Sequence, residues 1–472
     1  MNQTLTSIDF PRRLDRPLFL SVLATGLLAF TGVVIETAMN VTFPTLMHEF
    51  QVTMSTVQWI TTGYLLLLAI VIPASPFIKK RFSSKAIFLT GNILFSFGTL
   101  LGFWAPSFGV LLLGRLLQGA GTGLALPLMF NIVMEQAPLA KIGLMMGTAT
   151  LTIAMAPAIG PSVGGWIVAS FGWRMIFAAL LPILLLSLLC GAFSIRQSSP
   201  LQAASFPGQT YLFLTIAFTC FILAASFAGQ RGWTDNLVLA LFAGSALFLT
   251  AFCRFSLTAF HPLIHLQVFR RSSFSFCVAG LLFLQFICLG LGFLIPNFAQ
   301  IVLKEDPFTA GCILLPGCLL GALLAPISGK LLDRFGARKP LLTGCLFVSL
   351  SLLAYNATLT DAAVPLMTGI YALFTLGQGF TSGNSMVAGL SALPPALKAD
   401  GNAVFNTLQQ LAGAIGTSIV ATVVSMPQAR FPQDLAAATS LGSRYAFLLL
   451  LILALLQFLC LYYGTKKKDT IA

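Results

Sequence analysis

Long apolar segments, each of about twenty residues and nearly free of charge, follow one another along the whole 472-residue chain. About twenty mostly apolar residues are what a helix needs to cross the hydrocarbon core of a bilayer. Only 8% of the residues are charged, whereas a soluble globular protein carries about 25%. So few charges could not cover the surface of a soluble protein of this length. The pattern therefore predicts a polytopic membrane protein and excludes soluble and disordered chains.

The apolar runs are continuous rather than alternating, which predicts an all-α protein and argues against a membrane β-barrel. Charged residues, Pro, Gly and Asn divide the runs into fourteen candidate helices. Most of the 26 Lys and Arg residues then fall on the cytoplasmic side, provided that both termini are cytoplasmic. The sequence therefore predicts an even number of spans with both ends of the chain in the cytoplasm.

An internal repeat separates fourteen spans from twelve. The segment Arg81-Phe82-Ser83-Ser84-Lys85 follows the second span, and Arg334-Phe335-Gly336-Ala337-Arg338 follows the tenth. Two six-span repeats would place these segments six spans apart, but they lie eight spans apart. Two extra helices, at about 210–229 and 235–253, are therefore expected between two six-helix bundles. The predicted units are a cytoplasmic segment 1–16, an N-terminal bundle 17–194, the inserted helices with their linkers 195–272, a C-terminal bundle 273–464 and a basic cytoplasmic tail 465–472.

Two charged residues lie inside the predicted spans. Twelve of the 13 acidic residues fall in loops or at helix ends, and the remaining one is Glu36 in the first span. Arg115, in the fourth span, is the embedded base. A charge inside lipid costs about 2.5–3.5 kcal/mol, so an embedded carboxylate indicates proton coupling. The alternative is that Glu36 and Arg115 form a structural ion pair that locks two helices, and the two interpretations are compatible.

Five motifs are spread from residue 35 to about 420. They are Ile35-Glu36-Thr37-Ala38-Met39-Asn40-Val41-Thr42-Phe43-Pro44; Trp59-Ile60-Thr61-Thr62-Gly63-Tyr64; Arg115, Gln118, Gly119 and Gly121; Gly160-Pro161-Ser162-Val163-Gly164-Gly165; and Gly329-Lys330-Leu331-Leu332-Asp333-Arg334-Phe335-Gly336-Ala337-Arg338-Lys339. Together they resemble the fourteen-span drug:proton antiporters of the major facilitator superfamily, and within them the Gram-positive lincomycin-resistance type. The resemblance implies a proton-driven exporter of the bacterial cytoplasmic membrane.

The resemblance also assigns roles to two motifs. Gly160, Pro161, Gly164 and Gly165 in the fifth span match the motif associated with antiporters. Small residues there allow close helix approach and Pro161 permits a bend, although ordinary close packing is the alternative. The second motif is the gating loop, Gly329, Asp333, Arg334, Gly336 and Arg338. Its carboxylate could cap the following helix and pair with an Arg, or the loop could simply be a solvated basic segment.

The first-half copy of the gating loop departs from the motif. Lys80 occupies the aspartate position and Pro76 the position of the leading glycine. An acid-based latch is therefore not expected in the N-terminal half.

Polar and aromatic side chains on otherwise apolar helices are candidates to line a substrate cavity. Each could instead pack in the core, face lipid or hydrogen-bond a neighbouring helix. The predicted cavity residues are Asn40, Phe43, Trp59, Tyr64, Gln118, Asn131, Gln285, Gln378, Asn384, Asn402, Asn406 and Gln409.

No Gly-x-x-x-x-Gly-Lys-Ser/Thr segment is present, so no ATP site and no cofactor are expected. The sequence predicts a multidrug efflux transporter that exchanges H⁺ for lipophilic neutral or monocationic compounds. The alternative is a proton-coupled transporter of a specific metabolite or nutrient. A membrane enzyme would need a cluster of reactive side chains at one membrane face, and none is seen. The expected partners are drug-like small molecules, H⁺ and the bilayer, with no nucleic acid and no second subunit.

Overall fold

The computed structural model describes residues 15–138, 142–197, 201, 206–258, 263, 265–394 and 397–466. The described residues form helices and contain no strand. Fourteen of the helices have between 20 and 33 residues. They are α1 (Arg16–Met39), α4 (Trp59–Arg81), α5 (Ser84–Phe103), α6 (Phe108–Gln136), α7 (Ile142–Phe171), α8 (Arg174–Ser194), α9 (Gly208–Arg231), α10 (Asn236–Thr258), α11 (Ser272–Ile301), α13 (Leu315–Phe335), α14 (Arg338–Thr358), α15 (Val364–Ser391), α16 (Lys398–Arg430) and α17 (Leu435–Gly464).

Twelve segments of the described chain are long and apolar enough to cross a membrane. Helices α7 and α15 complete the set of fourteen long helices. Helix α15 carries polar side chains such as Gln378 and Asn384 within its 28 residues. The predicted all-α membrane fold with fourteen long helices is confirmed.

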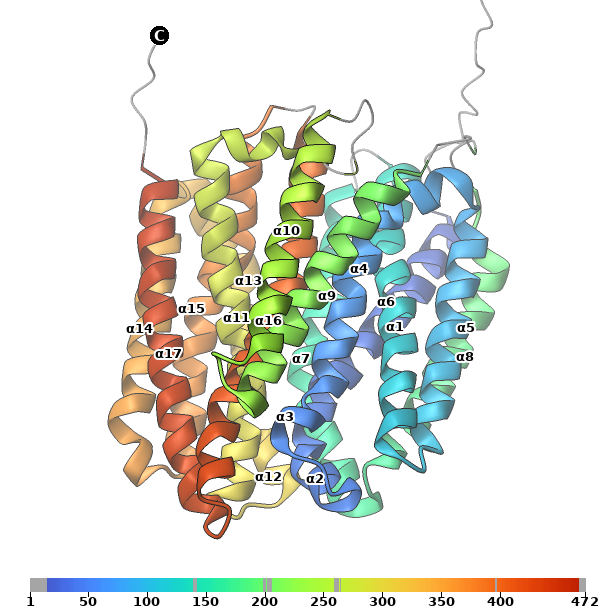
Figure 1. Cartoon of the computed structure of the whole chain (residues 1–472). Helices are drawn as coiled ribbons and strands as arrows, with labels where there is room; N and C mark the ends of the chain where they lie inside the picture. The colour runs from blue at the N-terminus through green and yellow to red at the C-terminus, as the bar shows by residue number, and fades with distance from the viewer. Residues whose placement is uncertain are drawn as a thin grey trace, which may run out of the picture.

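The long helices pack as two six-helix bundles with a helix pair beside them (Figure 1). Helices α1 and α4 to α8 pack mainly on one another, as do α11 and α13 to α17. We call these groups the N-half and the C-half. Helices α9 and α10 pack against each other, and α9 lies against α16 of the C-half and α4 of the N-half. The exact limits of the predicted units stay a prediction.

Polar side chains begin several helices by accepting hydrogen bonds from free backbone N–H groups. The carboxylate of Asp15 accepts from Leu18 N at 3.0 Å at the start of α1, and Asp434 accepts from Ala437 N at 3.0 Å at the start of α17. Because the number of long helices is even, α1 begins and α17 ends at the same end of the bundle. We call this the terminal end and the other the opposite end.

Four short helical pieces lie at the opposite end, at the bottom of Figure 1. The 3₁₀ turn η1 (Asn40–Thr42) and helix α2 (Phe43–Phe50) continue α1, α3 (Met54–Val57) precedes α4, and α12 (Pro307–Cys312) precedes α13. Two further 3₁₀ turns are η3 (Leu266–Arg270) and η4 (Leu359–Asp361). The N-half and C-half meet through α7 with α12 and α13, through α4 with α16, and through η1 with α11.

Candidate functional site

The two embedded charges predicted from the sequence are both buried in the N-half. The side chain of Glu36 on α1 is 6% exposed, and that of Arg115 on α6 is fully buried. Each lies within reach of the other's charge. The ion pairs among the described residues include neither of them, so the direct pair considered above does not form in this structure.

Arg115 is held by three neighbours. Its Nε donates to the carbonyl of Ile60 at 3.0 Å, and Nη1 donates to Gln118 Oε1 at 2.7 Å. The guanidinium lies over the ring of Tyr64, 4.5 Å from the centroid, which is a cation–π arrangement. The buried Nη2 has no hydrogen-bond partner among the described residues. The two N–H groups of Nη2 are therefore free to bind an anion, a water molecule or a substrate group.

A chain of hydrogen bonds extends this network through the N-half. Gln118 Nε2 donates to Thr99 Oγ1 of α5 at 2.9 Å, and the hydroxyl of Tyr64 donates to Thr122 Oγ1 at 3.0 Å. All four side chains are buried. Tyr64 and Gln118, two of the predicted cavity residues, therefore orient Arg115 in this structure.

Asn40 begins the 3₁₀ turn η1 and lies about one helical turn beyond Glu36 of α1. Its Oδ1 accepts from Thr61 Oγ1 of α4 at 3.0 Å. An added Cβ at Gly292 of α11 would lie 3.8 Å from Asn40 Nδ2, so this amide nitrogen faces the C-half. Asn40 thus stands at the boundary between the halves.

The C-half faces Glu36 with polar side chains of α11, α15 and α16. Cys288 on α11 lies within reach of the Glu36 charge, and Gln378 Nε2 of α15 contacts Cys288 Sγ at 3.0 Å. One turn earlier on α11, Gln285 Oε1 accepts from Gln409 Nε2 of α16 at 3.3 Å. Of the predicted cavity residues, Gln378 therefore contacts Cys288, while Gln285 and Gln409 are bonded to each other about one turn away along α11.

The halves are sealed against each other at the opposite end by α11 and η1. Pro44 has no N–H to offer the carbonyl of Asn40 four residues before it. Asn297 Nδ2 of α11 donates to that carbonyl at 3.4 Å, and Gln300 Nε2 donates to the carbonyl of Val41 at 2.9 Å. Phe43, a predicted cavity residue, belongs to this seal, because its ring packs on Phe293 with centroids 5.6 Å apart.

The fifth-span motif forms a second seal at the same end. Gly160 and Gly164 lie against α1, where an added Cβ would meet Thr37 Oγ1 at 2.0 Å or Ala38 Cβ at 2.7 Å. Gly165 lies against α12, with the carbonyl of Pro307 2.2 Å from its Cβ position. The carbonyl of Pro161 lies 2.0 Å from the Cβ position of Gly311 in α12. The motif therefore lets α7 contact both α1 and the C-half at backbone distance.

Other predicted cavity residues lie elsewhere. Trp59 Nε1 donates to Ser226 Oγ of α9 at 2.7 Å, so its indole faces an inserted helix. Asn384 Nδ2 donates to Ser328 Oγ at 2.8 Å within the C-half. Near the terminal end of α16, Asn406 Nδ2 donates to the carbonyl of Asn402 at 2.9 Å.

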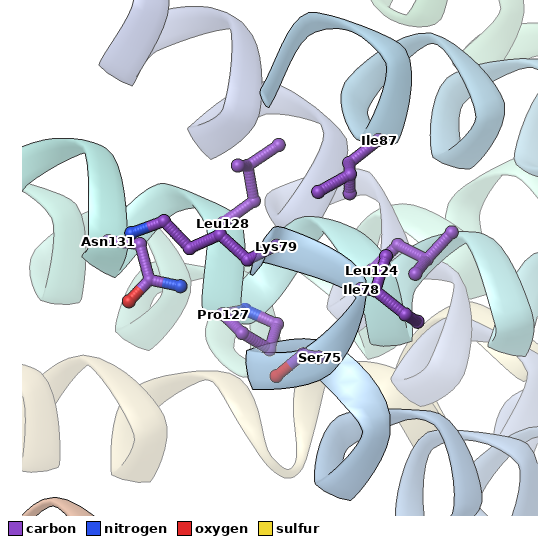
Figure 2. A pocket seen from close by; sticks show the side chains of 8 residues that line it. All are labelled: Ser75, Ile78, Lys79, Ile87, Leu124, Pro127, Leu128 and Asn131. Carbon is purple, nitrogen blue, oxygen red and sulfur yellow. The ribbon is translucent and has the colours of Figure 1, made fainter. Parts of the chain in front are cut away.

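Asn131 lines a small pocket between α4, α5 and α6 (Figure 2). Lys79 also lines it and forms an ion pair with Glu135 of α6. This pair links α4 and α6 at the terminal end. It lies next to residues 81–85, the first-half copy of the gating loop, in which the aspartate of the motif is missing. The other lining residues are Ser75, Ile78, Ile87, Leu124, Pro127 and Leu128.

The gating loop is described in part. Gly336 ends α13 with φ of 73°, a conformation that favours glycine. Nothing lies within 4 Å of an added Cβ at Gly329. Arg334 lies over Phe335 at 5.2 Å, and Arg338 lies over Tyr462 of α17 at 4.9 Å. The side chain of Asp333 lies outside the described residues, so its predicted pairing stays a prediction.

A metal site is not suggested by this geometry, since the described residues contain no cluster of three or more His, Cys, Asp or Glu.

The comparisons with known proteins agree with the motifs. The Major Facilitator Superfamily model matches residues 22–417. The chain belongs to this superfamily. It is 33% identical to the lincomycin resistance protein LmrB of Listeria innocua over 461 residues, which cover 96% of this chain and 97% of the relative. It is 30% identical to the multidrug export protein EmrB of Haemophilus influenzae over 423 residues, covering 87% of this chain and 81% of the relative. The predicted resemblance is confirmed.

Solved structures of other superfamily transporters share the fold. A bacterial homologue of the lysosomal transporter Spinster, in an inward-facing and unoccupied conformation, is 15% identical. It matches with a TM-score of 0.70, covering 97% of this chain and 100% of that one. A D-xylose–proton symporter, 14% identical, matches with a TM-score of 0.65, covering 95% and 96% of the two chains.

The sequence reasoning did not find four contributors to this site, namely Asn297, Gln300, Cys288 and Ser226. Asn297 and Gln300 are amides near the end of an apolar helix, so they carry the same signal as Gln285 and could have been included. Cys288 and Ser226 are small residues that are common in membrane helices. Only the packing of the helices singles them out.

Proposed function

We propose that the chain is a proton-coupled multidrug exporter of the bacterial cytoplasmic membrane, with both termini in the cytoplasm. It exchanges H⁺ for lipophilic neutral or monocationic compounds by alternating access. The observation that carries this proposal is Glu36, a buried carboxyl group beside a buried Arg115 with a free N–H. A carboxyl group in this position can exist as the acid or as the ion, because Arg115 compensates its charge in the ionised form.

The seal at the opposite end supports the alternating-access part of the proposal. With cytoplasmic termini, the opposite end faces outward, so the contacts of α11 with η1 and of α7 with α12 close the outer side. Export then requires these contacts to open while Glu36 takes up a proton from outside. Drug leaves outward, and loss of the proton to the cytoplasm restores the closed outer side.

The energy of one proton suffices for modest export. One charge crossing 100 mV supplies about 2.3 kcal/mol, which corresponds to about a 50-fold gradient of a neutral compound. A single buried acid can offset only one positive charge, so neutral and monocationic substrates are expected over dications. The names of the LmrB relatives make lincosamides the first class to try.

Glu36→Gln tests the coupling role, since glutamine keeps the shape and cannot ionise. In inverted membrane vesicles that contain the full chain, an imposed pH gradient should drive drug accumulation by the wild type and not by the variant. Binding of the drug without a gradient should survive. Gradient-driven accumulation by Glu36→Gln would show that another group couples the proton.

The alternative transporter of a metabolite or nutrient differs in the direction of flux. An antiporter accumulates substrate in inverted vesicles that are acidic inside, whereas a symporter would release it under the same gradient. The direction of proton-linked flux therefore separates the two functions before any substrate is identified in the cell.

A further inference from the structure

The first turn of α4 is the part of the N-half that holds both Arg115 and Asn40. The carbonyl of Ile60 accepts from Arg115 Nε at 3.0 Å, and the next residue, Thr61, donates to Asn40 Oδ1 at 3.0 Å. Ile60 and Thr61 are both buried. Any shift of this turn would therefore move the guanidinium and the Asn40 amide together.

The same turn is fastened from its other side by the inserted helix α9. Ser226 Oγ accepts from Trp59 Nε1 at 2.7 Å and from Gln58 Nε2 at 3.3 Å. Gln58 is in turn bonded to Thr62 through its Oε1. Ser226 and Gln58 are fully buried, so water does not replace these bonds.

The neighbouring residue of α9 is bonded to the C-half. Thr422 Oγ1 of α16 donates to the carbonyl of Ala225 at 3.2 Å, and Thr422 is buried. Two consecutive residues of α9 therefore contact different halves of the molecule. When the halves move against each other, α9 can keep its bonds to Trp59 and to Thr422 only if α4 or α16 moves together with α9.

We propose that Ser226 is a positioning residue for the Glu36–Arg115 site and that α9 links this site to the position of the C-half. The inference rests on the proposed proton-coupled export. Among the hydrogen bonds of the described residues, the side chain of Ser226 bonds to Gln58 and Trp59 and to neither Glu36 nor Arg115. It acts by holding residues 58–62, which supply the carbonyl to Arg115. The inserted pair is thereby part of the coupling machinery and more than a spacer between the bundles.

Ser226→Ala removes the shared acceptor with little change in volume. The matched control is Ser245→Ala, since Ser245 is a buried serine of α10 whose hydroxyl donates to the carbonyl of Ala217 in α9 at 2.9 Å. That bond joins the inserted helices to each other and touches neither half. Both variants lose one buried serine hydroxyl, and only the first loses contact with α4.

The assay is pH-gradient-driven uptake of ethidium, a fluorescent lipophilic monocation, into inverted vesicles at a series of outer pH values. Ser226→Ala should lower the rate about tenfold and move the midpoint of its pH profile by about half a unit, because loss of the acceptor leaves Arg115 poorly oriented. Ethidium binding without a gradient should change less than about twofold. Ser245→Ala should keep the wild-type profile.

Trp59→Phe supplies an independent test because it removes one donor to Ser226 and keeps an aromatic ring, although that ring is smaller than the indole. Its effect should be smaller than that of Ser226→Ala, and the double variant should resemble Ser226→Ala alone. Thr422→Val should also lower the rate, because it removes the hydrogen bond from α16 to the carbonyl of Ala225 in α9. The inference would be overturned if the fold-losses of uptake rate in Ser226→Ala and Trp59→Phe multiplied in the double variant. It would also be overturned if the pH profile of Ser226→Ala equalled that of Ser245→Ala.

The two levels of the proposal fail in different ways. If the wild-type chain shows no gradient-driven uptake of ethidium or lincomycin, the proposed function is wrong. If the wild type is gradient-driven and Ser226→Ala matches it at every pH, only the role of Ser226 is wrong.

Discussion

Replacing Gly311 by alanine should open the seal between α7 and α12. The Cβ position of Gly311 lies 2.0 Å from the carbonyl oxygen of Pro161 and 2.6 Å from its carbon. Real Cβ atoms essentially never approach another heavy atom closer than 3.0 Å. Both obstructing atoms belong to backbone, so no side chain can rotate away. The two helices must therefore separate by about 1 Å for the alanine to fit.

Overpacking of this kind costs about 1–3 kcal/mol. The cost applies only to the state in which α12 touches α7, since the open state has no such contact. A difference of about 1.4 kcal/mol is a factor of ten in an equilibrium constant, so Gly311→Ala should shift the conformational equilibrium by about 5-fold to 140-fold. Gly165→Ala should act in the same direction, because its Cβ would lie 2.2 Å from the carbonyl of Pro307.

Spin labels at Phe171 and Lys304 can measure the separation. Both side chains are exposed. Phe171 is the last residue of α7, and Lys304 lies in the connection between α11 and α12. The nine native cysteines are first replaced so that only the labels react. Double electron–electron resonance on the full chain in lipid nanodiscs should show a longer-distance population that is minor in the parent and dominant in Gly311→Ala.

Gly109→Ala is the matched control, because Gly109 lies in α6 and nothing is within 4 Å of its Cβ position. It should reproduce the parent distances. Gly311→Ala protein that is present in normal amount with the same distances as Gly109→Ala would refute the reasoning. The close approach would then be relieved by local movement within α12 rather than by separation of the halves.

Three further outcomes are expected. Lys79→Glu should lower thermal stability by about 1 kcal/mol in a detergent melting assay, since it places two acids together, and adding Glu135→Lys should restore the loss. Hydrogen bonds from Thr309, first through its side chain, lower the pKa of Asp306, so its stabilising effect on α12 is present above its ordinary pKa and is lost as pH falls below it. Asp306→Ala should therefore lower the melting temperature at pH 7 and lower it less at pH 3, and Asp306→Asn should keep most of the cap. Tyr64→Phe should keep most gradient-driven uptake because the ring remains under the guanidinium, whereas Tyr64→Leu should lose about tenfold.

The fold was predictable because charge is so rare in this chain. Each apolar run must be a helix in lipid, since the backbone has no water to bind. The repeat of the loop motif at Arg81 and Arg334 then required the two extra helices. These are constraints on single helices and their order, and they do not depend on how helices pack.

Only those site residues could be predicted whose type alone is unusual in a membrane helix. Glu36 and Arg115 stand out because a buried charge is costly, and both are buried. Tyr64 and Gln118 were expected to line a cavity, which stays a prediction, and in this structure both contact Arg115. A polar side chain in a membrane helix signals only that it needs a partner, and its partner depends on tertiary packing.

Trp59 shows the same limit. Aromatic residues that begin a membrane helix serve equally well at a membrane interface, a drug-binding surface or a helix contact. In the structure, Trp59 Nε1 donates to the hydroxyl of Ser226, which is distant in the chain and lies on the inserted helix α9. The sequence could identify α9 as an insertion, but not the side on which it would lie.

Asn40 joins the two parts of the mechanism that we propose. Its side chain is held by Thr61 in the turn that also holds Arg115, while its backbone carbonyl accepts a hydrogen bond from Asn297 Nδ2 in the seal at the opposite end. Glu36 precedes it by four residues, which is slightly more than one helical turn or about 6 Å along the helix axis. A proton that reaches Glu36 therefore changes the charge about one turn before the Asn40 carbonyl. Pro44 has no N–H that could form the helical i→i+4 bond to that carbonyl. Proton binding and opening of the outer side would then be linked through one turn of helix, without a long relay between distant sites.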